Sequence, residues 1–336
     1  MARRGIVIFG LLLAGNIAAW LWALAAFHGR PAPLAAAVLA YSFGLRHAFD
    51  ADHIAAIDNV TRKLMQNGQQ PIGVGFFFSL GHSSVVVGLS LAIALTTTIA
   101  QRHFTALKEV GAIVGTSVSA LFLLAIATAN AVVLIQIAAA FRRAEGGARM
   151  EAGEVDAVLD RRGFLGRLLR PAFALVNQSW QMYPLGLLFG LGFDTATEVG
   201  LLGISASQAA HGLPVWSILV FPTLFTAGMT LTDTTDGLLM VGAYGWASVR
   251  PLRKLYYNMT ITFASILVAL AVGGVEALGL IGDRLRLGGP FWSFVGWLNG
   301  NFGFLGYAIV GFFIVGWVAS ILFYKMRGYD SLDASA

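Results

Sequence analysis

The sequence predicts an all-α integral membrane protein with about eight transmembrane helices and a possible inverted repeat. Of its 336 residues, 57% are hydrophobic and only 12% are charged, whereas roughly 25% are charged in a typical soluble domain. A chain with so few charges cannot cover its surface with groups that water solvates, so most of that surface must face lipid. Apolar runs of the about 20 residues needed to cross the hydrocarbon recur along the whole chain.

These runs place the helices in a single polytopic membrane domain, residues 1–336. The expected spans are 5–27, 34–60, 72–99, 110–140, 181–204, 214–243, 258–281 and 302–324. The long hydrophilic stretch at about 142–178 mixes arginines with acidic residues, which predicts a cytoplasmic loop. A cleavable signal peptide is the alternative interpretation of the first span. Its apolar run is longer than the about 7–15 residues of such a signal, which favours a span.

The basic residues predict the orientation of the bundle. If the N-terminus is cytoplasmic, most of the 22 lysines and arginines fall in segments on the inner side, as the positive-inside rule requires. We therefore expect a multi-pass protein of the cytoplasmic (inner) membrane with both termini in the cytoplasm. The net charge of +5 is then explained by the basic residues that flank the spans on the cytoplasmic side. The lipid bilayer is the expected partner, nucleic acid is not, and the oligomeric state stays open.

Ionisable side chains interrupt four of these spans. An acid or base at mid-membrane costs roughly 2.5–3.5 kcal/mol, and such residues usually mark the path of an ion or substrate. In the orientation above, the four groups share one depth, between the midplane and the cytoplasmic side, which predicts a transport site. They are Arg46, His47, Asp50, Asp52, His53 and Asp58 in the second span, His82 in the third, Asp194 and Glu198 in the fifth, and Asp233 and Asp236 in the sixth.

The types of these side chains indicate a divalent transition metal. Cysteine is absent, which excludes thiolate ligands, and imidazole with carboxylate suits Ni, Co, Zn, Fe or Mn. The predicted site is built mainly from His47, Asp50, His53 and His82. The full set of predicted metal residues is His47, Asp50, Asp52, His53, His82, Asp194, Glu198, Asp233 and Asp236, with Ser83, Thr195, Thr197 and Met229 beside them.

Each of these side chains also has a structural alternative. Arg46 is expected to pair with Asp50 at i+4. His82, taken alone, could be a hydrogen-bonded core residue. Asp233 and Asp236 could bridge helices, so the cluster in the second span carries most of the argument.

The distance between the two histidines of the second span predicts whether that span is a continuous helix. On a continuous α-helix, His47 and His53 are about 9 Å apart along the axis and roughly 120° apart around it. Metal–nitrogen bonds near 2 Å require ligands within roughly 4 Å of each other. Either the span is broken between Ala48 and Asp52, or the histidines serve successive positions along a path. We expect the break, because two imidazoles suit nickel better than one, although neither Pro nor Gly lies between them.

These same residues resemble a known family. Arg46-His47-Ala48-Phe49-Asp50-Ala51-Asp52-His53-Ile54 is similar to the RHA-[VF]-DADHI signature of the nickel/cobalt transporter family, often called NiCoT. Further blocks that agree are Leu80-Gly81-His82-Ser83-Ser84-Val85-Val86, Leu191-Gly192-Phe193-Asp194-Thr195-Ala196-Thr197-Glu198, and Gly228-Met229 with Asp233-Thr234-Thr235-Asp236-Gly237. Ser83 and Ser84 depart from the pattern, because family members often have an acid or a threonine after this histidine.

The resemblance implies high-affinity uptake of Ni²⁺ or Co²⁺ across the cytoplasmic membrane by a single-component permease. The metal is then the substrate, and no cofactor is expected. The resemblance also implies that His47, Asp50, Asp52 and His53 are central, with Asn16 of the first span nearby. The position of Phe49 is Val or Phe in the family and is linked to metal preference. We expect Phe49 to tune selectivity by crowding the site.

The remaining inferences concern mechanism. No GxxxxGK[ST] run is present, so no P-loop in this chain hydrolyses ATP. A secondary transporter, or a transporter with an energising partner, is left, and we expect a secondary transporter rather than an enzyme. The alternatives are a membrane-embedded metal-dependent enzyme that uses the same His/Asp cluster and, less favoured, an ion channel.

Phe43-Gly44-Leu45 before Phe49-Asp50 resembles Phe189-Gly190-Leu191 before Phe193-Asp194. Because spans two and five run in opposite directions, this match predicts an inverted repeat.

Overall fold

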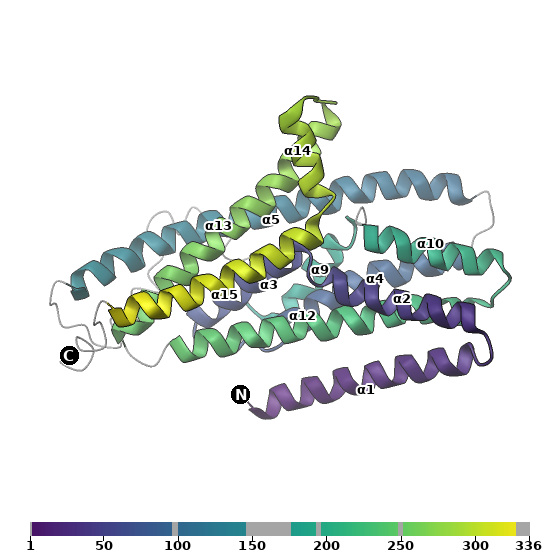
Figure 1. Cartoon of the computed structure of the whole chain (residues 1–336), viewed down its shortest axis with the longest axis horizontal. Helices are drawn as coiled ribbons and strands as arrows, with labels where there is room; N and C mark the ends of the chain where they lie inside the picture. Colours follow the sequence, from purple (N-terminus) through teal and green to yellow (C-terminus); the bar gives the residue numbers. More distant parts are fainter. Residues whose placement is uncertain (1, 96–99, 146–175, 193–195, 248–250, 327–336) are drawn as a thin grey trace.

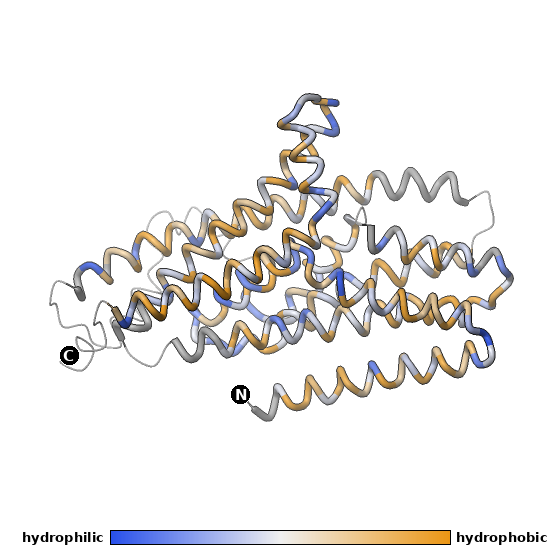
Figure 2. Tube along the Cα trace, viewed as in Figure 1, coloured by the Kyte–Doolittle hydropathy of each residue, from blue (hydrophilic) through white to orange (hydrophobic). Residues whose placement is uncertain are grey.

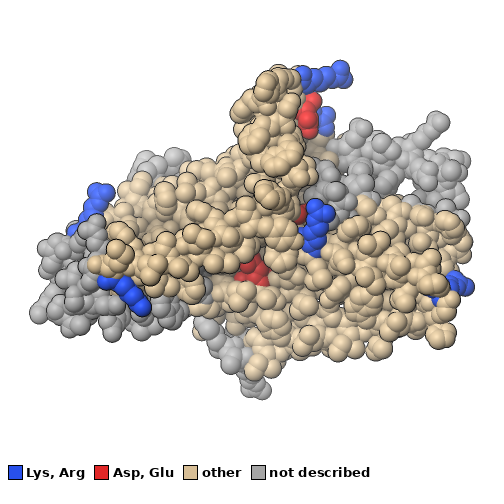
Figure 3. All heavy atoms as spheres, in the orientation of Figure 1, with Lys and Arg blue, Asp and Glu red and all other residues tan. Residues whose placement is uncertain are grey.

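The computed structural model describes residues 2–95, 100–145, 176–192, 196–247 and 251–326. Within these ranges the elements are helices and no strand occurs, which confirms the all-α prediction. The helices form an elongated bundle (Figure 1) whose tube is largely hydrophobic (Figure 2). Most of the described surface in Figure 3 carries no charge, and a surface of this kind needs lipid as its solvent. The predicted loop at about 142–178 lies largely outside the described residues.

Six helices are long and apolar enough to cross a membrane. They are α1 (Ala2–Ala26), α4 (Val74–Leu95), α5 (Ala100–Glu145), α12 (Val220–Ala247), α13 (Pro251–Arg284) and α15 (Phe302–Met326). They correspond to predicted spans one, three, four, six, seven and eight. The shorter elements η1 (Ser179–Gln181), α11 (Val215–Ile218) and α14 (Pro290–Asn299) lie between them, and α14 projects away from the bundle (Figure 1).

The other two predicted spans are each divided into two shorter helices. Span two consists of α2 (Pro31–His47) and α3 (Ala51–Gln66), and span five consists of α9 (Met182–Phe189) and α10 (Ala196–Ala210). The described residues therefore contain six uninterrupted candidate spans, and the total of about eight stays a prediction. The break that we expected in the second span is confirmed. Both divided segments carry residues of the predicted site.

The break in the second span begins with a tightened last turn of α2. The N–H groups of Phe49 and Asp50 donate to the carbonyls three residues earlier, those of Arg46 and His47, at 3.0 and 2.8 Å. Asp50 is then extended, with φ −67° and ψ 146°, and α3 begins at the next residue. Side chains on the two sides of the break therefore need not follow the 100° per residue of one helix.

Helix α15 packs directly against the backbone of this turn. A Cβ at Gly306 would overlap the carbonyl oxygen of Phe49, and a Cβ at Gly303 would lie 3.3 Å from Oδ1 of Asp50. The two glycines therefore allow an approach that no larger residue could match. The ring of Phe49 packs on Tyr307 of the same helix, with centroids 5.3 Å apart. We call Gly303, Gly306 and Tyr307 the α15 clamp.

Helix α2 crosses α12 through a pair of glycines. A Cβ at Gly44 would overlap the backbone of Phe225, and a Cβ at Gly228 would lie 2.8 Å from the carbonyl oxygen of Tyr41. In each helix the glycine follows the contacted residue by three positions. Small residues at such crossings let two membrane helices pack backbone against backbone.

Helices α9 and α4 cross in the same way. Gly186 faces the backbone of Phe78, and Gly81 faces the carbonyl of Tyr183, each so closely that a Cβ would overlap it. Again each glycine follows the contacted residue by three positions. The two crossings therefore have equivalent contacts.

The two crossings also match in sequence. Tyr-x-x-Gly at 41–44 recurs at 183–186, and Phe-x-x-Gly at 225–228 recurs at 78–81. An inverted repeat of spans one to three and four to six would relate α2 to α9 and α12 to α4. The contacts support such a repeat in a register different from the predicted match of 43–45 with 189–191. The repeat itself stays a prediction.

Helix α3 lies at the centre of the bundle, and its residues 53–64 are all buried. Ile54, Ile57 and Val60 belong to a core that also includes residues of α4, α5, α13 and α15. A second core joins α1, α2 and α12, where the rings of Phe27 and Phe221 stack. The first half of α3 is thereby fixed between the two cores, which positions the residues that follow the break.

Candidate metal centre

Three histidines from three helices meet inside the bundle. His47 is the last residue of α2, His53 lies in the first turn of α3, and His82 lies in α4. Their ring centroids are 4.7 to 4.9 Å apart, and each ring offers a nitrogen within 4.8 Å of the others. All three side chains are buried. The break thus brings His47 and His53 within reach of one ion, which a continuous helix could not do.

Glu198 of α10 adds a carboxylate to this group. Its Oε1 lies 2.7 Å from Nε2 of His82 and 3.6 Å from Nε2 of His47. The two Nε2 atoms are 3.0 Å apart. Donor atoms that each lie about 2 Å from one ion have separations of this size. Three helices therefore present two imidazole nitrogens and one carboxylate oxygen with the spacing of a coordination shell.

Two buried acids hold the other ring nitrogens of the histidines. Nδ1 of His47 donates to Oδ2 of Asp50 at 2.7 Å, and Nδ1 of His53 donates to Oδ2 of Asp233 at 3.2 Å. A carboxylate that accepts the Nδ1 proton leaves the lone pair on Nε2, which is the arrangement found at metal-binding histidines. Nε2 of His53 is buried and has no hydrogen-bond partner. The geometry therefore suits Asp50 and Asp233 to orienting the imidazoles.

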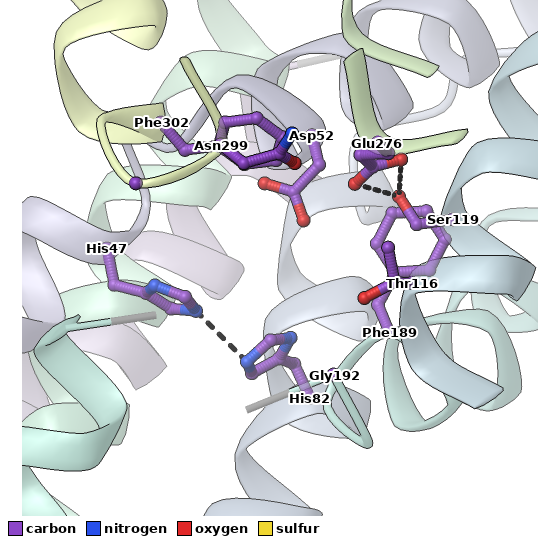
Figure 4. A pocket seen from close by; sticks show the side chains of 11 residues that line it. His47, Asp52, His82, Thr116, Ser119, Phe189, Gly192, Glu276, Asn299 and Phe302 are labelled. Carbon is purple, nitrogen blue, oxygen red and sulfur yellow. Dashed lines mark hydrogen bonds between the residues drawn. The ribbon is translucent and has the colours of Figure 1, made fainter. Parts of the chain in front are cut away.

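Asp52 faces a cavity that begins beside the histidines. The cavity has a volume of about 170 Å³, and His47, His82 and Asp52 lie on its wall (Figure 4). Oδ1 of Asp52 is buried and has no hydrogen-bond partner.

Other predicted residues surround this group or fall outside the description. Ser83 and Met229 are buried on α4 and α12. Asp236 lies on α12 three residues beyond Asp233, and its Oδ2 is buried without a hydrogen-bond partner. Asp194, Thr195 and the side chain of Thr197 lie outside the described residues.

Asn16 takes part in helix packing. Its Nδ2 donates to the carbonyls of Leu12 and Ala227, at 2.9 and 3.3 Å. Its Oδ1 accepts a hydrogen bond from the hydroxyl of Tyr41 at 3.0 Å. Asn16 thus joins α1, α2 and α12. Any effect of Asn16 on metal binding would therefore be indirect, through the packing of these helices.

The expected pair of Arg46 with Asp50 is wrong. Arg46 is exposed, and no ion pair between it and Asp50 occurs in the described part of the chain, where Asp50 pairs with His47 instead. The extended backbone at Asp50 is the reason. It removes the carboxylate from the i+4 position that a continuous helix would give it.

Phe49 lies in the turn between α2 and α3, and the expectation that it crowds the site stays a prediction. Its ring packs on Tyr307 of α15, while the ring neighbours of His47 are His53, His82 and Phe225. The printed ring contact of Phe49 is therefore with α15, on the side of the turn that carries His47. Sequence reasoning missed the α15 clamp, although the Gly-x-x-Gly spacing at 303–306 is a sign of close helix packing.

Sequence reasoning also missed a buried polar network on α3 beyond the site. Arg62 is 2% exposed and donates to Ser265, Thr262 and Asn59 at 3.1 to 3.3 Å. Asn130 of α5 donates to the same oxygen of Asn59 at 2.8 Å. The polar side chains of Asn130 and Thr262 within apolar runs were the available signal.

Comparison with known proteins identifies the family. The chain matches the NicO family, described as high-affinity nickel-transport protein, over residues 34–323. A high-affinity nickel transport protein of Cupriavidus necator is 57% identical over 98% of this chain and 94% of its own length. The nickel transporter NixA of Staphylococcus aureus is 45% identical over 86% and 84%. The cobalt transport protein NhlF of Rhodococcus rhodochrous is 42% identical over 86% and 82%. No solved structure matches significantly. A chain with these matches along most of its length belongs to the NicO family of high-affinity nickel-transport proteins.

Proposed function

We propose that this protein takes up Ni²⁺ or Co²⁺ across the cytoplasmic membrane as a single-component secondary transporter. The observation that carries the proposal is the spacing of Nε2 of His47, Nε2 of His82 and Oε1 of Glu198, between 2.7 and 3.6 Å. Relatives named for nickel transport and for cobalt transport resemble the chain over most of its length. Both ions are therefore candidate substrates.

The proposed ligands are Nε2 of His47, His53 and His82 together with Oε1 of Glu198. Imidazole with a single carboxylate favours Ni²⁺ and Co²⁺ over Mg²⁺ and Ca²⁺, which prefer oxygen ligands. Asp50 would fix the ring of His47. Asp233 would fix the ring of His53, and both acids would offset the charge of the cation in the apolar bundle.

The proposed path follows the two divided helices. Irregular backbone at membrane depth is tolerated where it is buried in protein or lines a cavity, and carriers place their sites there. Asp52 would receive the ion on the side of the cavity, and Asp236 would lie beyond Asp233 on the way to the cytoplasm. We keep both termini and the loop at about 142–178 in the cytoplasm, because the basic residues concentrate there.

The metal-dependent enzyme is less well supported. A catalytic metal needs an open coordination position for water and a substrate cleft, whereas the three histidines are buried and the cavity that His47 and His82 line measures only about 170 Å³. The names of these relatives also describe transport. An ion channel would conduct without the accumulation that an uptake system produces.

Accumulation of radioactive nickel in cells that express the protein tests the proposal. We expect accumulation that an uncoupler abolishes, and loss of uptake in His82→Ala and Glu198→Gln with protein levels in the membrane unchanged. His211→Ala is the matched control, because His211 is exposed and donates only to a backbone carbonyl of its own helix in the described structure, that of Ser207. Bound metal without accumulation would favour the enzyme, and wild-type uptake by His82→Ala would refute the site.

A further inference from the structure

The cavity beside the histidines has a second polar wall that the proposed metal centre does not use. Glu276 of α13 is 3% exposed and lines this wall together with Ser119 of α5. The hydroxyl of Ser119 lies 2.8 Å from both carboxylate oxygens of Glu276. Ionisable side chains within a membrane usually mark the path of an ion or substrate. The place of Glu276 on the cavity wall therefore calls for a functional explanation.

Asn299 fixes the connection between α14 and α15 over this wall. Its Nδ2 donates to the carbonyl of Val275, the residue before Glu276, at 2.9 Å, and to the carbonyl of Val295 at 3.1 Å. The amide packs on Gly279, where a Cβ would overlap it. Asn299 also lines the cavity (Figure 4). The wall is thus a rigid, hydrogen-bonded structure.

Two buried polar atoms that belong to the cavity lining have no hydrogen-bond partner. They are Oδ1 of Asp52 and Nδ1 of His82, and His82 as a whole is 3% exposed. Buried polar atoms in native proteins are normally satisfied by protein, water or a ligand. In Figure 4 the carboxylates of Asp52 and Glu276 lie on the same side of the cavity, across from the two imidazoles. A cavity of about 170 Å³ has room for a cation with several waters.

The geometry points to an outer cation site, formed by the carboxylates of Glu276 and Asp52 with the hydroxyl of Ser119 and the amide of Asn299. This site holds a partly hydrated divalent cation before the imidazoles take it. Oxygen ligands bind Mn²⁺, Mg²⁺ and Ca²⁺ as well as Ni²⁺, so the outer site concentrates cations and the histidines select among them. Its role in transport rests on the proposed function, but cation binding there does not.

The chemistry of the two sites predicts the order of events. Ser119 lies in the first half of α5, and Glu276 lies near the end of α13, which are the outer halves of both helices in the proposed orientation. A hydrated ion exchanges water for oxygen ligands readily. It loses more water only where the nitrogen ligands of His47 and His82 replace it. The cavity joins these two sets of donors without an intervening wall, since His47, His82 and Glu276 all line it.

Mn²⁺ binding to the purified full-length protein in detergent, followed by electron paramagnetic resonance, tests the outer site. We expect Glu276→Gln to weaken Mn²⁺ binding about tenfold, because removing a carboxylate from a metal site costs at least that much affinity. Glu276→Asp should restore most of it. Asp283→Asn is the matched control, since Asp283 is an exposed acid on the same helix. His53→Ala should retain Mn²⁺ at the outer site, because His53 is not part of its lining.

Nickel uptake measured across a range of concentrations tests the role in transport. Glu276→Gln should raise KM about tenfold and leave Vmax within about twofold, because it weakens capture and spares the inner ligands. Wild-type Mn²⁺ binding by Glu276→Gln, or a loss of Vmax at unchanged KM, would overturn the outer site. If Glu276→Gln does not reach the membrane, Ser119→Ala replaces it in both experiments, and its Mn²⁺ binding, KM and Vmax are judged in the same way. If the wild-type protein accumulates no nickel, the proposed function fails, while the Mn²⁺ data still decide whether the outer site exists.

Discussion

Nε2 of His47 and Nε2 of His82 lie 3.0 Å apart, although 35 positions separate the two residues in the sequence. At this distance one nitrogen carries a proton and the other a lone pair, unless a cation takes the place of the proton. Oε1 of Glu198 is within 3.6 Å of both nitrogens. An imidazole nitrogen binds a metal only when it carries no proton, so a metal that bound both nitrogens would release the proton that lies between them. The pair therefore has the geometry of a site where a divalent ion and a proton compete.

Asp233→Ala should lower the apparent affinity for nickel. Its carboxylate accepts the Nδ1 proton of His53, and the substitution leaves a buried N–H without an acceptor and the ring without its orientation. Loss of such a carboxylate typically costs 10–100-fold in metal affinity. The concentration dependence of nickel uptake measures the effect. Asp233→Asn keeps an acceptor oxygen and should recover part of the loss. Equal KM values for Asp233→Ala and wild type would contradict the orienting role.

Gly306→Ala should destabilise the protein and reduce uptake. The new methyl group would overlap the carbonyl oxygen of Phe49, so α15 must withdraw from the broken turn, and overpacking of this kind costs about 1–3 kcal/mol. Thermal unfolding in detergent and nickel uptake are the measurements. Gly311→Ala on the same helix meets nothing within 4 Å and should leave both unchanged. Equal behaviour of the two variants would show that the α15 clamp does not hold the turn.

Phe49→Val should change the ratio of nickel to cobalt uptake through Tyr307. The ring pair, with centroids 5.3 Å apart, contributes about 0.5–1.5 kcal/mol beyond area burial, and its loss frees the turn that carries His47. Tyr307→Leu should shift the ratio in the same direction, and the double variant should shift it no further than either single one. Additive shifts would indicate that Phe49 acts independently of the clamp.

Gly44→Ala and Gly186→Ala should destabilise the protein to similar extents. Each glycine lies at a crossing where a Cβ would overlap the backbone of the facing helix, at Phe225 and Phe78 respectively. Equivalent crossings in an inverted repeat should carry similar packing energy. Thermal unfolding in detergent compares them with Gly88→Ala, where nothing lies within 4 Å. A large loss in one variant and none in the other would count against the repeat.

The amino-acid sequence alone places the chain in a membrane and points to the residues of its proposed site. Hydropathy placed the six long helices, because burial in lipid depends on composition and length alone. The cost of ionisable groups in a membrane singled out His47, His53, His82 and Glu198, whatever the packing around them. The reach of two imidazoles even predicted the break between α2 and α3, since coordination distances are fixed by the metal.

The directions in which these side chains point depend on the tertiary structure. No Pro or Gly marks residues 48–50, whereas Gly303 and Gly306, some 250 positions away, let α15 pack closely on the turn. That turn directs Asp50 to His47 instead of Arg46. In the sequence, Glu276 is likewise an isolated acid near the end of a span. In the structure, α5 and the α14–α15 connection lie beside it around one cavity. The direction of a side chain follows from the backbone dihedrals of its residue. At these positions the local sequence is compatible with more than one set of dihedrals, and packing against distant helices selects one of them.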